Sequence, residues 1–171
     1  MAVETSDRAL VELAVGPGET LLMHGAASVV GSVGVQLAVA RGATVIGTAS
    51  EANHDYLHSL GAIPVVYGDG LADRVRAVAP QGIDALDVSV QLCGGTTDRI
   101  VTISDPRAFE LGITFSGDSR RFGPELTEYA RLAADGRLSV RVDRNFPLAD
   151  AAKAHELSET GRARGKVLLR P

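Results

Sequence analysis

Short apolar runs alternate with apolar patterns of helical spacing along most of the chain. The apolar runs predict strands at 20–24, 44–48, 64–67, 85–88, 99–103 and 111–115. The helical spacing predicts helices at 31–41, 53–60, 71–78 and 124–134. Alternation of strand and helix is typical of a doubly wound α/β fold. We therefore expect a mostly parallel, six-stranded sheet with helices on both faces.

The two ends of the chain depart from this alternation. Residues 2–14 predict one amphipathic helix, which ends at Gly16-Pro17-Gly18. The C-terminal stretch predicts a strand, a helix and a second strand, at 138–142, 150–159 and 166–169. We expect a main α/β domain at 1–136, with 1–16 as its leading helix, and a C-terminal tail at 137–171.

Composition and charge narrow the possible partners. The chain is 45% hydrophobic but only 4% aromatic, without Trp, so aliphatic residues must form the core, as in buried parallel strands. The net charge is −4 and Arg is mixed with acidic residues, which argues against nucleic-acid binding. No apolar stretch is long enough to span a membrane. The single cysteine, Cys93, excludes an internal disulfide framework. We expect a cytoplasmic protein with no membrane partner.

The first predicted strand leads through small residues into an apolar helix, which is the arrangement that binds a pyrophosphate. Free backbone amides at a helix N-terminus point at the anion, and the helix dipole favours it. When the Gly-x-Gly-x-x-Gly pattern is aligned on Gly31, its first two glycines fall on Ala26 and Ser28. The third glycine, which allows close packing of helix and strand, is present. The pattern predicts a dinucleotide site, and the alternative is an ordinary tight turn.

The end of the second strand bears on the choice of nucleotide. That strand ends in Gly47-Thr48-Ala49-Ser50, without the Asp or Glu that would bind an NAD ribose. A neutral end leaves room for a 2′-phosphate, so NADP(H) is favoured over NAD(H). Asn53 and His54 follow, and each is equally well explained as a helix cap or an exposed polar residue.

The sequence gives little support for other kinds of catalytic site. The four histidines are His24, His54, His58 and His155, and none has a companion at metal-ligand spacing. We therefore expect no metal. Serines lie near His24, but the nucleophile-elbow pattern Gly-x-Ser-x-Gly is absent, which argues against acyl transfer. By residue type alone, His24, Asp87 and Tyr67 are candidates for a general acid.

Four sequence segments carry a resemblance to a known family. They are GPGETLLMHGAA at 16–27, VGSV with VQLA within 30–38, FPLADAA at 146–152 and RGKVLL at 164–169. The chain resembles the medium-chain dehydrogenase/reductase superfamily, and most closely its zinc-free, NADPH-dependent quinone oxidoreductases. The resemblance implies a Rossmann-type cofactor domain and hydride transfer to a small carbonyl, enone or quinone. It also implies that the N-terminal catalytic domain of that family is absent.

The resemblance also implies which residues contact the cofactor. Those at the pyrophosphate are Ala26, Ala27, Ser28, Val29, Val30 and Gly31. Those around the adenosine 2′-phosphate are Ser50, Asn53, Tyr67 and Lys166. Those that face the nicotinamide are Ser89, Ser104 and Gly117. The family usually has a lysine at the position of Asn53.

The chain departs from the family in ways that affect its function. Ser28 and Val29 replace the two inner glycines of the turn, and Val is a poor residue for a positive φ. We expect them to crowd the phosphate, so that cofactor binding is weakened or lost. Without the catalytic domain, the apolar C-terminal tail needs another cover. We expect a homo-oligomer, a dimer formed through strand 111–115, through the tail, or through both.

Three functions remain open after these observations. The leading one is an NADP(H)-dependent oxidoreductase reduced to its cofactor domain. The second is a non-redox enzyme, such as a cyclase or isomerase, that reuses the scaffold without the cofactor. The third is a non-catalytic binding module, because a fold does not dictate a function.

Overall fold

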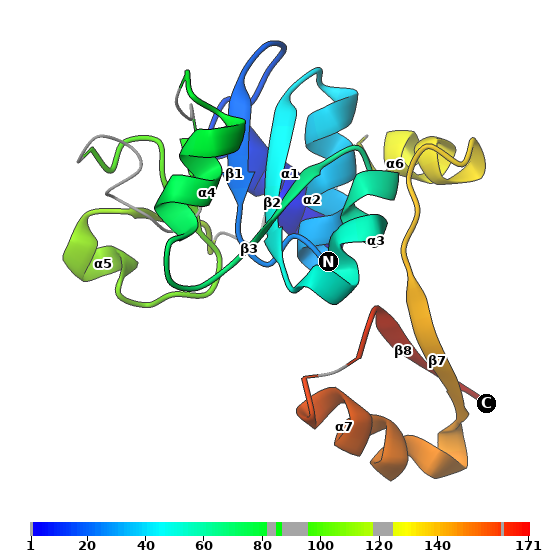
Figure 1. The fold of residues 1–171 in the computed structure, drawn as a ribbon. Coiled ribbons are helices and arrows are strands. Elements are labelled where there is room, and N and C mark those ends of the chain that lie inside the picture. The colour runs from blue at the N-terminus through cyan, green and yellow to red at the C-terminus, as the bar shows by residue number, and fades with distance from the viewer. Residues whose placement is uncertain (1, 82–84, 87–95, 118–124, 162) are drawn as a thin grey trace. The chain divides into compact units, whose positions relative to one another are not determined.

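The computed structural model describes residues 2–81, 85–86, 96–117, 125–161 and 163–171. The chain forms two compact units, Met1–Leu138 and Ser139–Pro171. The first unit has a parallel sheet in the order β3-β2-β1-β4, made of β1 (Thr20–Met23), β2 (Thr44–Ala49), β3 (Ile63–Val66) and β4 (Ala85–Leu86). Figure 1 labels β1, β2 and β3 of this sheet. A separate parallel pair consists of β5 (Val101–Thr102) and β6 (Thr114–Phe115). The order from β3 to β4 is that of a Rossmann-like fold.

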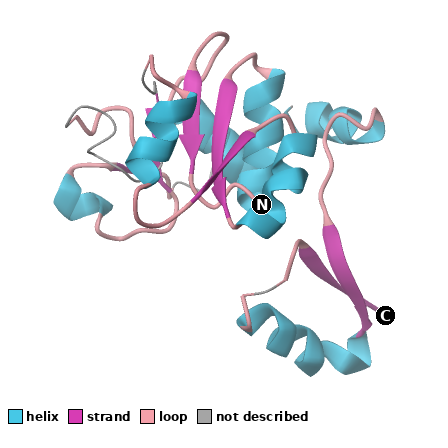
Figure 2. Ribbon diagram, in the orientation of Figure 1, coloured by secondary structure: helices cyan, strands magenta, loops and turns pink. Residues whose placement is uncertain are grey.

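Helices cover both faces of the four-stranded sheet (Figure 2). The helices of the first unit are α1 (Ala2–Glu12), α2 (Val29–Ala40), α3 (His54–Ser59), α4 (Leu71–Val78), α5 (Ala108–Leu111) and α6 (Glu125–Ala134), with a 3-10 turn η1 (Glu51–Asn53). Helices α1 and α2 pack on one face, and α4 packs on the other.

Successive strand residues supply the two cores. Leu21 and Val45 pack with residues of α1 and α2, whereas Leu22 and Ile46 pack with Val75 of α4. All five are at most 2% exposed. Side chains alternate between the faces of a strand, so a sheet that is covered on both sides needs apolar residues at every position. This explains the continuous apolar runs in the sequence.

The second unit has the predicted order of strand, helix and strand. It contains β7 (Val142–Pro147), the 3-10 turn η2 (Leu148–Asp150), α7 (Ala151–Glu159) and β8 (Lys166–Arg170). The two strands pair in parallel, and α7 makes the crossover between them. Among the described residues of the whole chain, no helix is long and apolar enough to cross a membrane.

The α/β fold with parallel strands agrees with the sequence analysis, but two predicted strands are wrong in part. Leu111 ends helix α5 instead of starting a strand, because Gly112 adopts φ +66° and closes the helix. Leu138 is buried in the first unit, and its amide and that of Arg137 donate to the Leu132 carbonyl at the end of α6. The next strand therefore starts only at Val142. A single six-stranded sheet is also not seen within the described residues, since β5 and β6 pair apart from the other four strands.

Candidate functional site

The turn between β1 and α2 is tied to the neighbouring strand β2. Thr48, which is buried, accepts hydrogen bonds from the Gly25 amide at its Oγ1 (3.2 Å) and from the Ala26 amide at its carbonyl (3.1 Å). The Nδ1 atom of His24 lies 3.3 Å from the same hydroxyl. Gly25 takes the positive φ of the turn, +61°. These contacts fix the path of the chain before it enters α2.

Gly31 lies where α2 comes closest to this turn. A Cβ at Gly31 would be 2.4 Å from the Gly25 carbonyl oxygen and 2.8 Å from the Cα of Ala26. Both neighbours are backbone atoms, so they could not rotate away. Only glycine fits here, which agrees with the close helix–strand packing that the sequence predicts.

The conformations of Ser28 and Val29 correct one expectation from the sequence. Ser28 is the N-cap of α2, with φ −68° and ψ 170°, and Val29 is the first residue of the helix. Among described residues other than glycine, Ala14 alone has a positive φ. Neither replacement of an inner glycine therefore strains the backbone, because the left-handed position of the turn belongs to Gly25.

The N-terminus of α2 has both occupied and open amides. The Ser28 hydroxyl accepts a hydrogen bond from the Gly31 amide at 3.0 Å. Within the part of the chain that the structure describes, the amides of Val29 and Val30 have no acceptor. Two donors and the helix dipole are thus available to an anion at this end of the helix.

Three predicted residues gather at the ends of β2 and β3. In the register of this strand pair, Ala49 lies opposite Val66, so the next residues, Ser50 and Tyr67, leave the sheet side by side. The Asn53 side-chain amide donates to the Ser50 hydroxyl at 3.1 Å. The Tyr67 side chain is 59% exposed. This edge therefore presents neutral polar groups to the solvent.

The ends of β5 and β6 carry Ser104 and Gly117. Thr102 Oγ1 accepts the Ser104 amide at 3.4 Å and the Asp105 amide at 3.2 Å, which turns the chain after β5. Hydrogen bonds from Arg107 lower the pKa of the Asp105 carboxyl below its ordinary value. A Cβ at Gly117 would lie 2.9 Å from the Phe115 ring.

Arg8 joins helix α1 to the end of β6, a contact that sequence analysis did not predict. Its Nε donates to the hydroxyl of Ser116 at 2.8 Å, and its terminal nitrogen donates to the Ser116 carbonyl at 3.1 Å. Ser116 is only 2% exposed. An arginine in an amphipathic helix has the same sequence pattern as a solvated residue, so nothing in the sequence indicates this partner.

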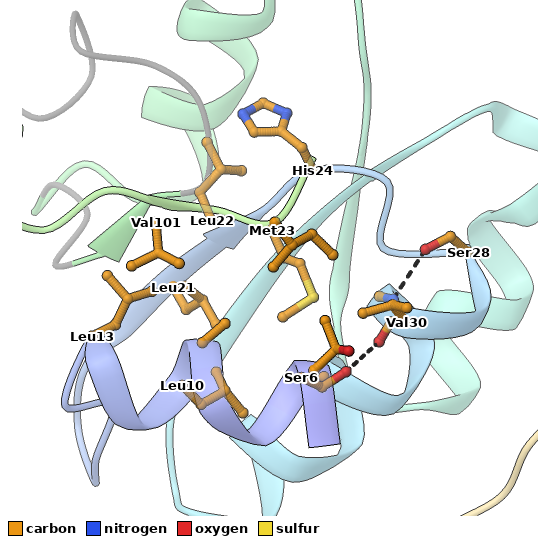
Figure 3. A pocket seen from close by; sticks show the side chains of 15 residues that line it. Ser6, Leu10, Leu13, Leu21, Leu22, Met23, His24, Ser28, Val30 and Val101 are labelled. Atoms are coloured by element: carbon orange, nitrogen blue, oxygen red, sulfur yellow. Dashed lines mark hydrogen bonds between the residues drawn. The ribbon is translucent and has the colours of Figure 1, made fainter. Parts of the chain in front are cut away.

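A cavity of about 90 Å³ lies beside the turn (Figure 3). Leu10 of α1, Leu13 just after that helix and Leu21 of β1 contribute to its largely apolar lining. Ser28 and His24 are among its polar lining residues. This volume is well below the roughly 300–1,000 Å³ of ligand pockets. It suits a small ring or an alkyl group, not a whole dinucleotide.

Two further candidates from the sequence lie outside the described residues, and a third belongs to the second unit. Ser89 and Asp87 lie outside the described residues. Lys166 is the first residue of β8 in the second unit, where it is exposed. Within the described residues, no three His, Cys, Asp or Glu side chains form a group that could hold a metal ion.

Comparison with known protein families shows which family the chain belongs to. A model described as zinc-binding dehydrogenase matches residues 57–169. The chain belongs to this family. The match confirms the resemblance drawn from the sequence motifs. The described residues do not supply a set of zinc ligands, so we derive no step through that metal.

Individual relatives are similar over the length of the chain. Polyketide synthase GfsB of Streptomyces halstedii is 34% identical over 99% of the chain, which spans 3% of that protein. The chloroplastic NADPH-dependent alkenal/one oxidoreductase of Arabidopsis thaliana is 30% identical over 100% of the chain, which spans 45% of it. The trans-enoyl reductase himH of Aspergillus japonicus is 52% identical over 47% of the chain, and the match covers 23% of that protein.

A solved structure agrees with this fold. The quinone oxidoreductase from Coxiella burnetii superposes with a TM-score of 0.79 and 30% identity, over 100% of this chain and 58% of that one. The chain thus spans about half the length of these oxidoreductases, and far less of the polyketide synthase.

Proposed function

We propose that the chain is the nucleotide-binding part of an NADP(H)-dependent reductase that acts on a carbon–carbon double bond conjugated to a carbonyl. Two relatives support this substrate class by their names, the alkenal/one oxidoreductase and the trans-enoyl reductase. NADPH dependence is likewise part of the name of the first relative. The neutral end of β2 supports the same nucleotide.

The residues of the chain take roles at three places along the nucleotide. The Val29 and Val30 amides bind the pyrophosphate at the N-terminus of α2. Ser50 and Tyr67 face the adenosine ribose at the ends of their strands, and we keep Ser89 and Lys166 as predicted contacts. When bound, the nucleotide would supply a hydride for the β-carbon of the substrate, and the α-carbon would take a proton from an acid of the chain or from water.

The strand order favours one of the candidates for the general acid. His24 follows β1 directly, next to the turn and the cavity. Tyr67 follows β3, which is separated from β1 by β2. Adjacent strands are about 4.8 Å apart, so Tyr67 lies roughly 10 Å from the β1 end. We therefore favour His24 over Tyr67 as the residue that could deliver a proton near the nicotinamide.

One observation carries the proposal, namely the two open amides at the start of a helix that Gly31 holds against the turn. The test is calorimetric titration of the chain with NADPH, NADP⁺ and NADH. We expect micromolar binding of NADPH and weaker binding of NADH. Absence of binding at millimolar concentrations of all three would overturn the proposal.

A second function, a non-redox enzyme that reuses the scaffold, is favoured by one contact. The Ser28 hydroxyl already occupies the Gly31 amide, which would otherwise be open to a phosphate. Ser28→Gly, alone and with Val29→Gly, distinguishes the two functions. If wild-type chain binds no nucleotide and these variants do, the turn has been closed and the second function is supported. If wild-type chain binds NADPH, the reductase is supported.

We also propose that a second copy of the chain covers apolar side chains of the second unit. Three large aliphatic side chains there are strongly exposed, with Val142 at 45%, Leu148 at 59% and Leu169 at 42%. Large aliphatic side chains this exposed are candidates for an interface. The sequence also predicts a dimer contact through a strand at 111–115. That strand comprises only Thr114–Phe115, since Leu111 belongs to α5.

A further inference from the structure

Arg74, near the start of α4, binds four successive carbonyl groups of the loop that follows β3. Its Nε donates to the Val66 carbonyl at 2.9 Å, and one terminal nitrogen donates to the Asp69 carbonyl at 2.9 Å. The other terminal nitrogen lies 3.4 Å from the Tyr67 carbonyl oxygen and 3.3 Å from that of Gly68. One guanidinium therefore shapes the whole loop.

The same arrangement turns the amides of the loop away from the guanidinium. In a trans peptide the carbonyl and the amide point in opposite directions. Among the described residues, the amides of Gly68, Asp69 and Gly70 have no acceptor. Gly68 and Gly70 have φ of +94° and +75° on either side of Asp69. Both glycines thus adopt backbone conformations that other residues rarely adopt, and the three amides stay open on the side of the loop away from the guanidinium.

The charge of Arg74 is also uncompensated by an ion pair. Arg41, Arg76, Arg99 and Arg107 each pair with a carboxylate, whereas no salt bridge to Arg74 occurs within the described residues. Its side chain is half-buried, so solvent screens its charge only in part. The loop therefore has outward-facing amides on one side and the Arg74 guanidinium, which has no ion-pair partner among the described residues, on the other.

This loop lies at the polar edge formed by β2 and β3. Since Ala49 pairs with Val66, the Val66 carbonyl that binds Arg74 is one strand spacing, about 4.8 Å, from the end of β2. The turn after β2 carries Glu51 and Asn53 and no basic residue. A dianionic group at this edge would thus take its positive partners from the loop and not from β2.

We propose that Arg74 is a positioning residue for the adenosine 2′-phosphate of NADP(H). This inference rests on the proposed function. Arg74 holds the 66–69 carbonyls, so that the Gly68, Asp69 and Gly70 amides are open to the 2′-phosphate. It takes the electrostatic role that a basic residue at Asn53 would fill. The Asp69 carboxylate is the nearest opposing charge in the loop, and it limits the affinity.

The test compares two fragments that differ only in the phosphate. Calorimetry with 2′,5′-ADP and with 5′-AMP is carried out on the chain and on Arg74→Gln. We expect the variant to bind 2′,5′-ADP at least tenfold more weakly and 5′-AMP with unchanged affinity. The affinity of Arg74→Lys for 2′,5′-ADP should lie between those of the wild type and of Arg74→Gln, because an ammonium group cannot bind four carbonyls with the fixed geometry of a guanidinium. Arg76→Gln, on the exposed face of the same helix, is the control and should change neither affinity.

Several results would overturn the proposal. An unchanged ratio of the two affinities in folded Arg74→Gln would do so, as would an equal loss for both fragments, which indicates a merely structural role. If Arg74→Gln does not fold, Asp69→Asn decides, because it removes a charge and keeps the backbone carbonyl that Arg74 binds. It should raise the affinity for 2′,5′-ADP severalfold and leave that for 5′-AMP unchanged. An unchanged affinity for 2′,5′-ADP would overturn the proposal.

The wild-type chain separates this inference from the function on which it rests. Equal affinity for 2′,5′-ADP and 5′-AMP would overturn the role of Arg74 alone, since a nicotinamide nucleotide without the 2′-phosphate could still bind. Absence of binding for both fragments and for NADPH would overturn the proposed function together with this inference.

Discussion

Gly31 shows most directly how one residue sets the geometry of the candidate site. In Gly31→Ala the new methyl group would meet the Gly25 carbonyl and the Ala26 Cα, so α2 would have to move away from the turn. Overpacking of this kind costs about 1–3 kcal/mol. We expect a loss of that size in urea unfolding.

Gly16→Ala is the matched control for Gly31→Ala. The nearest atom to its Cβ would be 3.9 Å away, which is ordinary van der Waals contact. We expect its free energy of unfolding to change by less than about 0.5 kcal/mol. Equal losses in the two variants would show that the close approach at Gly31 has no special role.

Ser28 permits a second prediction, on stability alone. Its hydroxyl caps α2 through the Gly31 amide. Removal of an N-cap acceptor by alanine costs about 1 kcal/mol, whereas glycine at the same position costs only a few tenths. We expect Ser28→Ala to unfold at lower urea concentration than Ser28→Gly. The opposite order would mean that the cap does not stabilise this helix.

At the scale of elements, Arg8 connects the first helix to the last strand of the first unit. Arg8→Ala would leave the buried Ser116 hydroxyl and carbonyl without their donors, which costs about 1–3 kcal/mol. Urea unfolding measures this loss. Arg76→Ala, whose ion pair with Asp73 is exposed, should lose less than about 1 kcal/mol. If the two losses were equal, the contact with Ser116 would not hold the strand.

Elements with a clear period could be predicted from the sequence, and those that depend on distant contacts could not. The helix at 71–78 has the bounds that its apolar spacing predicts. The run at 111–115 is equally compatible with a strand and with the end of a helix, and only the conformation of Gly112 decides. The sequence predicts strain at Val29, which the structure does not show, because the sequence does not tell which residue of the turn takes the positive φ.

In the candidate site, too, residues within a local motif could be predicted, and residues that act through distant contacts could not. The turn residues follow one another in the sequence, so the motif locates them. Arg8 and Arg74 act through carbonyls and a hydroxyl that have no sequence signature, and the Ser116 partner of Arg8 is 108 positions away. Contacts of this kind become visible only when the chain is folded.

At the scale of the whole molecule, the second unit allows a test of self-association. It exposes Leu148 at 59%, and a second copy that covered this surface would remove apolar area from water. We expect sedimentation equilibrium to give twice the 17.8 kDa of the chain. Leu148→Glu would place a charge in the contact, so it should shift the mass toward one chain.

Ala152→Glu, which adds the same charge at an exposed position of α7, should remain a dimer. A mass of one chain for the wild type at every concentration would contradict the dimer, and dissociation of both variants would show that net charge, not the Leu148 surface, controls the association.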